Sequence, residues 1–142
     1  MDLLHLLGVT GAISGATLFG SMAFFSCVIA PLIFIELDAA TAGRFIRRLF
    51  PWYYVVVAVL SLIATLSFAA KLPIDAVIMG LVFVGAYISR QVLMPRINRW
   101  SDAMVQGDVS AEVPFQRLHR FSVLINAAQT IAVFCILFRS LS

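Results

Sequence analysis

The sequence predicts an all-α fold: an integral membrane four-helix bundle with a short interfacial helix between the first and second spans. Composition is the first reason, because 62% of the 142 residues are hydrophobic and only 12% are charged, against about half and a quarter in soluble domains. Distribution is the second, since the apolar residues fall into four runs long enough to cross a bilayer as helices. Lipid must cover this surface, because a small soluble domain keeps a large share of its surface exposed.

The first span is predicted at about residues 3–35, where the apolar run ends at Glu36. At 1.5 Å per residue this helix is about 50 Å long, whereas the hydrocarbon core is ~30 Å thick. It must therefore tilt, kink or protrude, and Pro31 is the predicted kink. The start of the chain lacks a basic segment, so we expect no cleavable signal peptide and a first span that stays in the mature protein.

Small residues within the spans predict close packing. Gly8, Gly11 and Gly15 share one face of the first span, which lets another backbone approach closely. We interpret this face as packing inside the bundle, with a contact between two copies of the chain as the alternative. The two cysteines, Cys27 and Cys135, have no metal-type spacing and are expected to be small buried hydrophobes.

Residues 38–50 predict a short helix that lies on the membrane surface. Their apolar side chains fall on one side of a helix and their basic side chains largely on the other, as in interfacial helices. The basic, membrane-surface residues are Arg44, Arg47 and Arg48. Pro51 then opens the second span, at about residues 52–70, because proline suits a first helical turn.

The third and fourth spans are predicted at about residues 74–93 and 121–138. A tight turn joins the second span to the third, and the longest polar stretch of the chain joins the third to the fourth. No long polar segment is left to form a soluble head. Residues 1–142 are therefore predicted to be a single four-span domain.

Basic residues predict the orientation of the bundle. Only Lys71 and Arg139 lie on the side of the chain termini, and the other eight of the ten cationic side chains lie on the opposite side. The positive-inside rule makes the Arg-rich loops cytoplasmic and both termini external, or periplasmic in a bacterium with two membranes. We expect a multi-pass protein of the cell (inner) membrane whose partners are the lipid bilayer and, at the Arg-rich face, anionic lipid headgroups. Nucleic acid is not an expected partner, because this face is short, interleaved with acids and pressed against the bilayer.

Polar residues in the fourth span form one helical stripe. His119, Ser122, Asn126 and Gln129 follow an i, i+3, i+7, i+10 pattern, and lipid offers them no hydrogen-bond partners. Hydrogen bonding between helices is one interpretation, and a ligand or proton path is the other. In the second interpretation the stripe and nearby basic groups bind a lipid or a small anion. The candidate residues are Arg90, Arg96, Asn98, His119, Ser122 and Asn126.

We expect no metal site and no cofactor. A haem held by both histidines is disfavoured, since His5 begins the first span on one side of the membrane and His119 begins the fourth on the other. The ~30 Å core would separate two ligands that one iron needs within a few ångströms.

Several segments together resemble the domain of unknown function 4149, the transmembrane protein 205-like family. They are residues 24–34, 42–44, 49–54, 94–98 and 115–122, followed by Asn126. The resemblance covers nearly the whole chain and implies a four-helix membrane protein without an established biochemical activity or an agreed set of catalytic residues. The positions that match the family pattern are Pro31, Gly43, Phe50, Pro95, Asn98, His119, Ser122 and Asn126.

The leading functional hypothesis is a small non-enzymatic accessory, assembly or scaffold subunit of a larger membrane complex, or a homo-oligomer. The alternative is a carrier or binding protein for a lipid or small molecule, which uses the stripe of the fourth span. A minor alternative is a haem or copper redox protein. A cavity beside Asn126 would favour the carrier, whereas a fully packed bundle would exclude it.

Overall fold

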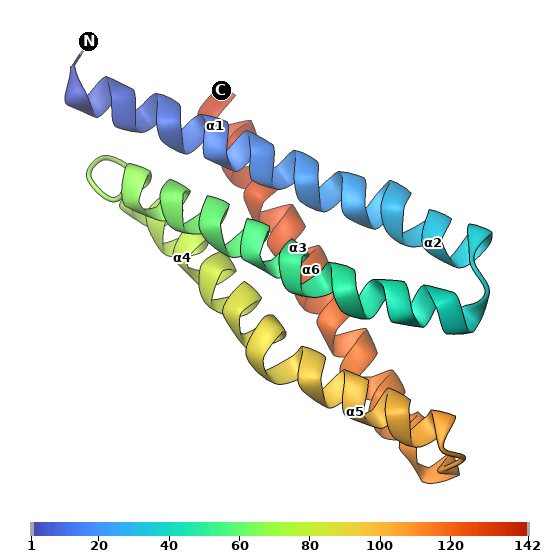
Figure 1. Ribbon diagram of the computed structural model, residues 1–142. Coiled ribbons are helices and arrows are strands. Elements are labelled where there is room, and N and C mark those ends of the chain that lie inside the picture. The colour runs from blue at the N-terminus through green and yellow to red at the C-terminus, as the bar shows by residue number, and fades with distance from the viewer. Residues whose placement is uncertain (1, 142) are drawn as a thin grey trace.

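The structure consists of four long helical rods, and the computed structural model describes residues 2–141 (Figure 1). Met1 and Ser142, the ends of the predicted domain, lie outside this range. Two of the rods contain a π-helical turn, η1 or η2, and the fourth starts with a short 3₁₀ turn, η3. The elements are α1 (Leu3–Phe24), η1 (Phe25–Ile29), α2 (Ala30–Glu36), α3 (Ala39–Phe68), α4 (Pro73–Ile88), η2 (Ser89–Leu93), α5 (Met94–Val105), η3 (Val109–Ala111) and α6 (Glu112–Leu141).

The all-α class and the four-helix bundle are confirmed. Each rod is long and apolar enough to cross a membrane. Large apolar side chains cover the outside of the rods, including Phe24, Trp52 and Leu66. Such an exterior fits contact with lipid rather than water. The protein is therefore a multi-pass membrane protein.

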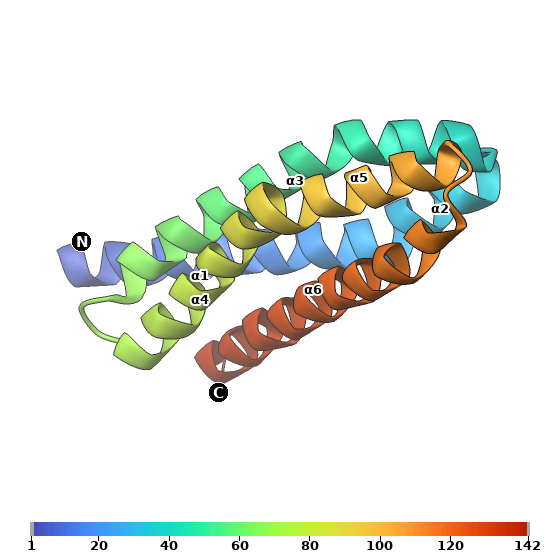
Figure 2. The ribbon, with the colours of Figure 1, turned by 90° about the horizontal axis from the view of Figure 1, so that it is seen from below.

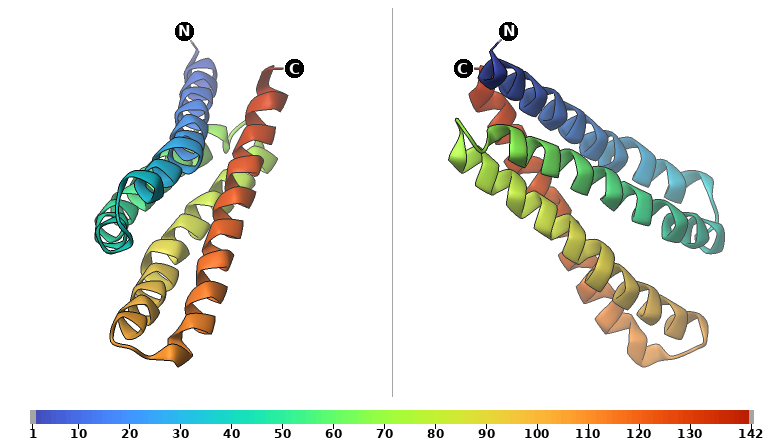
Figure 3. Two further views of the ribbon diagram at one scale, coloured as in Figure 1. Left: turned by 90° about the vertical axis from the view of Figure 1, so that its right-hand side faces the viewer. Right: turned by 60° about the vertical axis from the view of Figure 1, so that its left-hand side comes forward.

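The rods form two helical hairpins that diverge toward one end. The first hairpin is α1, α2 and α3, and the second is α4, α5 and α6. Within the bundle α3 contacts both α1 and α4, and α6 contacts α1, α4 and α5. Figures 1 and 3 show that the tips of the two hairpins separate where α2 meets α3 and α5 meets α6, and Figure 2 shows the termini at the other end. The separated tips form the Arg-rich end, which carries Arg44, Arg47, Arg48, Arg96, Arg99, Arg117 and Arg120.

An apolar core joins the hairpins in the middle of the bundle and toward the termini. Because lipid is as apolar as a leucine side chain, close packing rather than transfer from water holds such a core together. The largest fully buried side chains are Leu18, Met22, Val57, Met79, Val133 and Ile136. Near the termini the buried Asp75, in the first turn of α4, accepts a hydrogen bond from Arg139 Nη2 of α6 at 2.8 Å. This ion pair links both helices of the second hairpin.

The segment predicted as an interfacial helix is helical, but it is not a separate element. Helix α3 runs from Ala39 through Pro51 to Phe68, so the second span and the Arg-bearing segment are one helix. Asp38 caps its start, because Oδ1 accepts hydrogen bonds from the backbone of Ala40 and Thr41 at 3.1 Å each. Hydrogen bonding with the Thr41 side chain and backbone holds the pKa of Asp38 below its usual range. Pro51 therefore lies inside the helix rather than at its start.

Just before Pro31, where the sequence predicted a kink, the structure has the π-helical turn η1. In η1 the N–H of Ala30 donates to the carbonyl of Phe25, five residues earlier. The turn η2 repeats this arrangement, with Met94 N–H donating to Ser89 and Pro95 one residue further on. Proline has no N–H to donate, so the regular hydrogen-bond ladder must change in this region. An inserted residue accommodates that change without breaking the rod.

Of the three glycines on the predicted packing face, two are packed inside the bundle and one is exposed. Gly11 is buried against the ring of Phe68 in α3, and Gly15 lies against Met79 and Leu137. Gly8 is exposed, with no atom within 4 Å of an added Cβ. The expectation for the cysteines is wrong: both are exposed on the outside of their helices. An apolar exterior accepts a thiol as readily as a core does.

Substitution of Gly11 by alanine should destabilise the bundle. A Cβ at this position would lie 2.3 Å from Cε1 of the buried Phe68 ring, so the ring or one of the two helices must move. Overpacking of this kind costs about 1–3 kcal/mol. We expect a lower thermal midpoint in mild detergent for Gly11→Ala. The matched control Gly8→Ala should leave the midpoint unchanged or raise it slightly, because alanine favours a helix over glycine. Equal midpoints for the two variants would contradict this packing.

Candidate functional site

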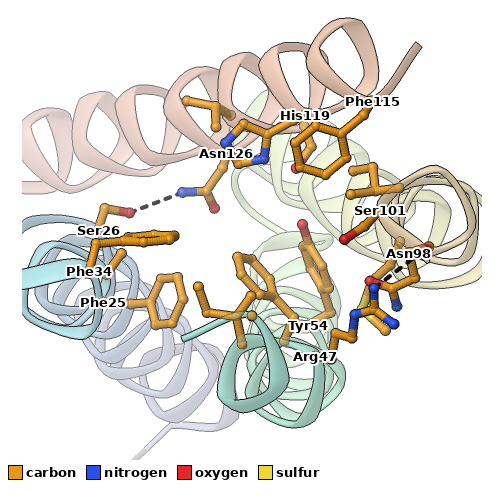
Figure 4. Close-up of a pocket in the computed structure, with 18 of the residues that line it drawn as sticks. Phe25, Ser26, Phe34, Arg47, Tyr54, Asn98, Ser101, Phe115, His119 and Asn126 are labelled. Atoms are coloured by element: carbon orange, nitrogen blue, oxygen red, sulfur yellow. Dashed lines mark hydrogen bonds between the residues drawn. The ribbon is translucent and has the colours of Figure 1, made fainter. Parts of the chain in front are cut away.

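A cavity of about 470 Å³ lies between the two hairpins at the Arg-rich end (Figure 4). Its volume is within the roughly 300–1,000 Å³ of typical ligand pockets. Its walls come from all four rods, and most of its surface is apolar, with the aromatic rings of Phe25, Phe34, Phe50 and Phe115. The polar side chains that line it are Ser26, Arg47, Tyr54, Asn98, Ser101, His119, Ser122 and Asn126.

Asn126 forms the floor of the cavity and joins three rods. Its Oδ1 accepts a hydrogen bond from the hydroxyl of Tyr53 in α3 at 2.5 Å. Its Nδ2 donates to Ser26 Oγ in η1 at 3.1 Å, the bond drawn in Figure 4. One turn earlier in α6, Ser122 interacts with the hydroxyl of Tyr54. The oxygen and the nitrogen of the Asn126 amide thus each have a hydrogen-bond partner, and both partners belong to the opposite hairpin.

Below this floor the polar stripe continues into a closed contact between α6 and α4. Gln129 is buried, and its Nε2 donates to the backbone carbonyl of Val82 at 2.9 Å. Gly85 makes this approach possible, because a Cβ there would lie 2.4 Å from Nε2. The predicted stripe therefore faces the bundle interior at Ser122, Asn126 and Gln129, with interhelical hydrogen bonds at the last two.

Arg47 lies at the mouth of the cavity, on the side between α3 and α5. Its Nη1 pairs with Asp102 Oδ1 at 2.5 Å, and its Nη2 donates to the backbone carbonyl of Asn98 at 3.4 Å. The side chain is 34% exposed. It was expected to lie on the membrane surface with Arg44 and Arg48. Those two are exposed, whereas Arg47 turns toward the cavity.

His119 lines the mouth of the cavity opposite Arg47, as Figure 4 shows. Its imidazole stacks on the ring of Phe115, one turn earlier in α6, with the ring centroids 5.9 Å apart and the planes 4° apart. The residue is nevertheless exposed. His5 lies in the first turn of α1, at the other end of the bundle, so the two histidines do not share a site.

The structure brings together four of the six candidate residues. Asn98, His119, Ser122 and Asn126 all line the cavity. The two arginines of the set are not among the lining residues: Arg96 is exposed, and Arg90 lies half-buried in η2, with its Nε enclosed and, within the described part of the chain, without a hydrogen-bond partner.

Sequence reasoning missed Ser26, Arg47, Tyr53 and Tyr54 as parts of this site. The sequence does give one indication that Ser26 faces the bundle: it is a polar residue in an apolar run, five residues before Pro31. Tyr53 and Tyr54 follow Pro51 near the start of the predicted second span, and nothing in the sequence pairs them with the fourth span. Only the side-chain contacts in the structure show that their hydroxyls meet polar groups of the other hairpin.

Comparison with family models gave a match to a domain of unknown function (DUF4149) over residues 13–106. These residues include the second half of α1, both π-helical turns, α2, α3, α4 and α5. Helix α6, which carries Asn126, follows the matched region. No match was found among curated proteins or solved structures.

A double-mutant cycle should detect the hydrogen bond between Tyr53 and Asn126. We expect Tyr53→Phe and Asn126→Ala to be coupled by about 0.6–1.7 kcal/mol, the range for interhelical hydrogen bonds in membranes. The measurement is the free energy of unfolding in mixed micelles. Thr130→Val is the matched control, because among the described residues the Thr130 hydroxyl bonds to the carbonyl of Asn126, in its own helix. Additive effects of Tyr53→Phe and Asn126→Ala would show that the bond does not hold the hairpins together.

Proposed function

The chain belongs to the family of the domain of unknown function DUF4149, in agreement with the sequence resemblance, and we propose that it binds an amphipathic lipid or small molecule in the cavity between its two hairpins. The observation that carries this proposal is the cavity of about 470 Å³ above Asn126. A fully packed bundle would have excluded such a role. The four spans act as one domain in this proposal, because the cavity takes residues from every rod.

The lining chemistry supports an amphipathic ligand. Aromatic rings of Phe25 and Phe50 make the inner wall apolar, whereas Arg47, Asn98 and His119 make the mouth polar. A ligand with an apolar body and a polar end matches both parts. An empty cavity would leave these rings without contacts on one side, and dispersion energy would be lost. A bound apolar chain restores those contacts.

A lateral opening supports entry from the membrane. Phe34 on α2 and Val123 on α6 both line the cavity, yet they are 62% and 52% exposed. They belong to walls contributed by opposite hairpins, so the cavity reaches the outside of the bundle between α2 and α6. Phe34 lies near the Arg-rich end of its span, and Val123 lies near the middle of its helix. A lipid in the adjacent leaflet would meet this opening without leaving the membrane.

The role of an accessory or assembly subunit stays a prediction, as does association with a second copy or a larger complex. Co-purification with a partner in mild detergent would support it. Ligand binding ranks ahead of it because the cavity is a specific feature of the chain itself, whereas a partner would require a surface that no described contact identifies.

We further propose that the Arg-rich end is cytoplasmic and contacts anionic headgroups, with both termini outside the cytoplasm. A reporter that is active only outside the cytoplasm should be active when fused to the C-terminus. The reason is the charge asymmetry between the two ends of the bundle. Activity of a C-terminal reporter that works only in the cytoplasm would overturn this orientation.

Filling the cavity should abolish ligand binding without damage to the fold. Gly43 lines the cavity, and no atom lies within 4 Å of a Cβ added there. We expect Gly43→Phe to place a ring in the cavity and to remove most of the lipid that co-purifies with the protein, as measured by mass spectrometry. Replacement of a helical glycine also removes a conformational cost, so the variant should remain folded.

Gly20→Phe is the matched control for Gly43→Phe. Gly20 is likewise a helical glycine with open space around an added Cβ, but it lies on the outside of α1 and does not line the cavity. Its lipid content should equal that of the wild type. Unchanged lipid content in both variants would refute binding in this cavity.

A further inference from the structure

We propose that the ligand of this cavity carries an anionic group, a carboxylate or a phosphate, and that Arg47 binds it at the mouth. This inference rests on the proposed function. Its basis is the charge of the lining: among the described lining residues the basic side chains are Arg47 and His119, and no carboxylate is present. Asp102, the ion-pair partner of Arg47, is not among the lining residues, so the lining itself favours a negative ligand.

The geometry leaves Arg47 able to bind such a group. Asp102 takes Nη1 and the Asn98 carbonyl takes Nη2, whereas a guanidinium carries five N–H donors in a planar fork. Asp102 is 53% exposed, so the ion pair is open to solvent. Exposed pairs of this kind contribute little to stability. A ligand anion can therefore replace Asp102 or share the guanidinium with it.

Neutral hydrogen-bonding groups surround the same point. Figure 4 shows Asn98 and Ser101 of α5 beside Arg47, with His119 of α6 across the mouth. Together they offer an amide, a hydroxyl and an imidazole to the remaining oxygens of a carboxylate or phosphate. Between this mouth and the polar floor at Asn126, the apolar rings of Phe25 and Phe50 line the cavity. The chain of the ligand therefore lies against these rings between the hairpins, with its charged end at the Arg-rich end.

The test compares ligands that share one 16-carbon chain. Palmitate and hexadecyl phosphate carry an anion on the chain, hexadecanol carries none, and inorganic phosphate is the anion without a chain. Binding to the purified full-length protein is measured by scintillation proximity with radiolabelled palmitate and competition by the others. We expect palmitate and hexadecyl phosphate to bind at least tenfold more tightly than hexadecanol, and 10 mM inorganic phosphate not to displace palmitate.

Two variants separate binding by Arg47 from a purely structural role. Arg47→Gln and Asp102→Asn both break the α3–α5 ion pair, but only the first removes the cation. We expect Arg47→Gln to lose at least tenfold in palmitate affinity and to keep hexadecanol affinity, whereas Asp102→Asn should bind palmitate as tightly as the wild type or more so. Arg48→Gln, on the exposed side of the same turn, should behave as the wild type.

The possible failures are distinguishable. Equal affinity for palmitate and hexadecanol, or equal loss in Arg47→Gln and Asp102→Asn, would overturn the anionic inference and leave the proposed function standing. Displacement of palmitate by inorganic phosphate would overturn the requirement for a chain. Absence of binding by all three chain-bearing ligands would overturn the proposed function itself.

Discussion

The amide of Asn126 is the interaction on which the rest of the site depends. A polar group inside a bilayer must find its partners within the protein, because lipid supplies none. Asn126 finds Tyr53 and Ser26, which lie on both rods of the opposite hairpin. These bonds join α6 to η1 and α3 at the depth where the hairpins begin to diverge. Below them the bundle is packed, and above them the same divergence leaves a cavity.

The two π-helical turns adapt the rods to this geometry. Each begins six residues before a proline, Pro31 or Pro95, and each rod continues beyond it. The extra residue rotates the side chains that follow relative to those before, which changes the face that each rod presents near the cavity. Ser26, in the first turn, reaches Asn126 from this irregular segment. The prolines therefore contribute to the site through the hydrogen-bond ladder rather than through contact with Asn126.

Much of the fold follows from sequence, because a lipid environment requires long apolar helices. Hydropathy located the four rods, and the spacing of Ser122, Asn126 and Gln129 identified the inward face of α6. Finer features depend on tertiary contacts that periodicity does not record. Arg47 and Arg48 are adjacent in sequence, but only the position of α5 makes the first an inward-facing residue. A proline in a sequence is also compatible with a kink, a helix start or a π-helical turn. The presence of Pro31 and Pro51 therefore did not show which of these forms at each position.

The central claim is that an elongated ligand occupies the space between Arg47 and Asn126. A density map of the protein purified from its own membrane, without added ligand, tests it most directly. The account predicts elongated density between the hairpins, with its polar end at Arg47 and its apolar end above Asn126. Hairpins packed together at the Arg-rich end, with Phe25 and Phe50 filling the space and no added density, would contradict it.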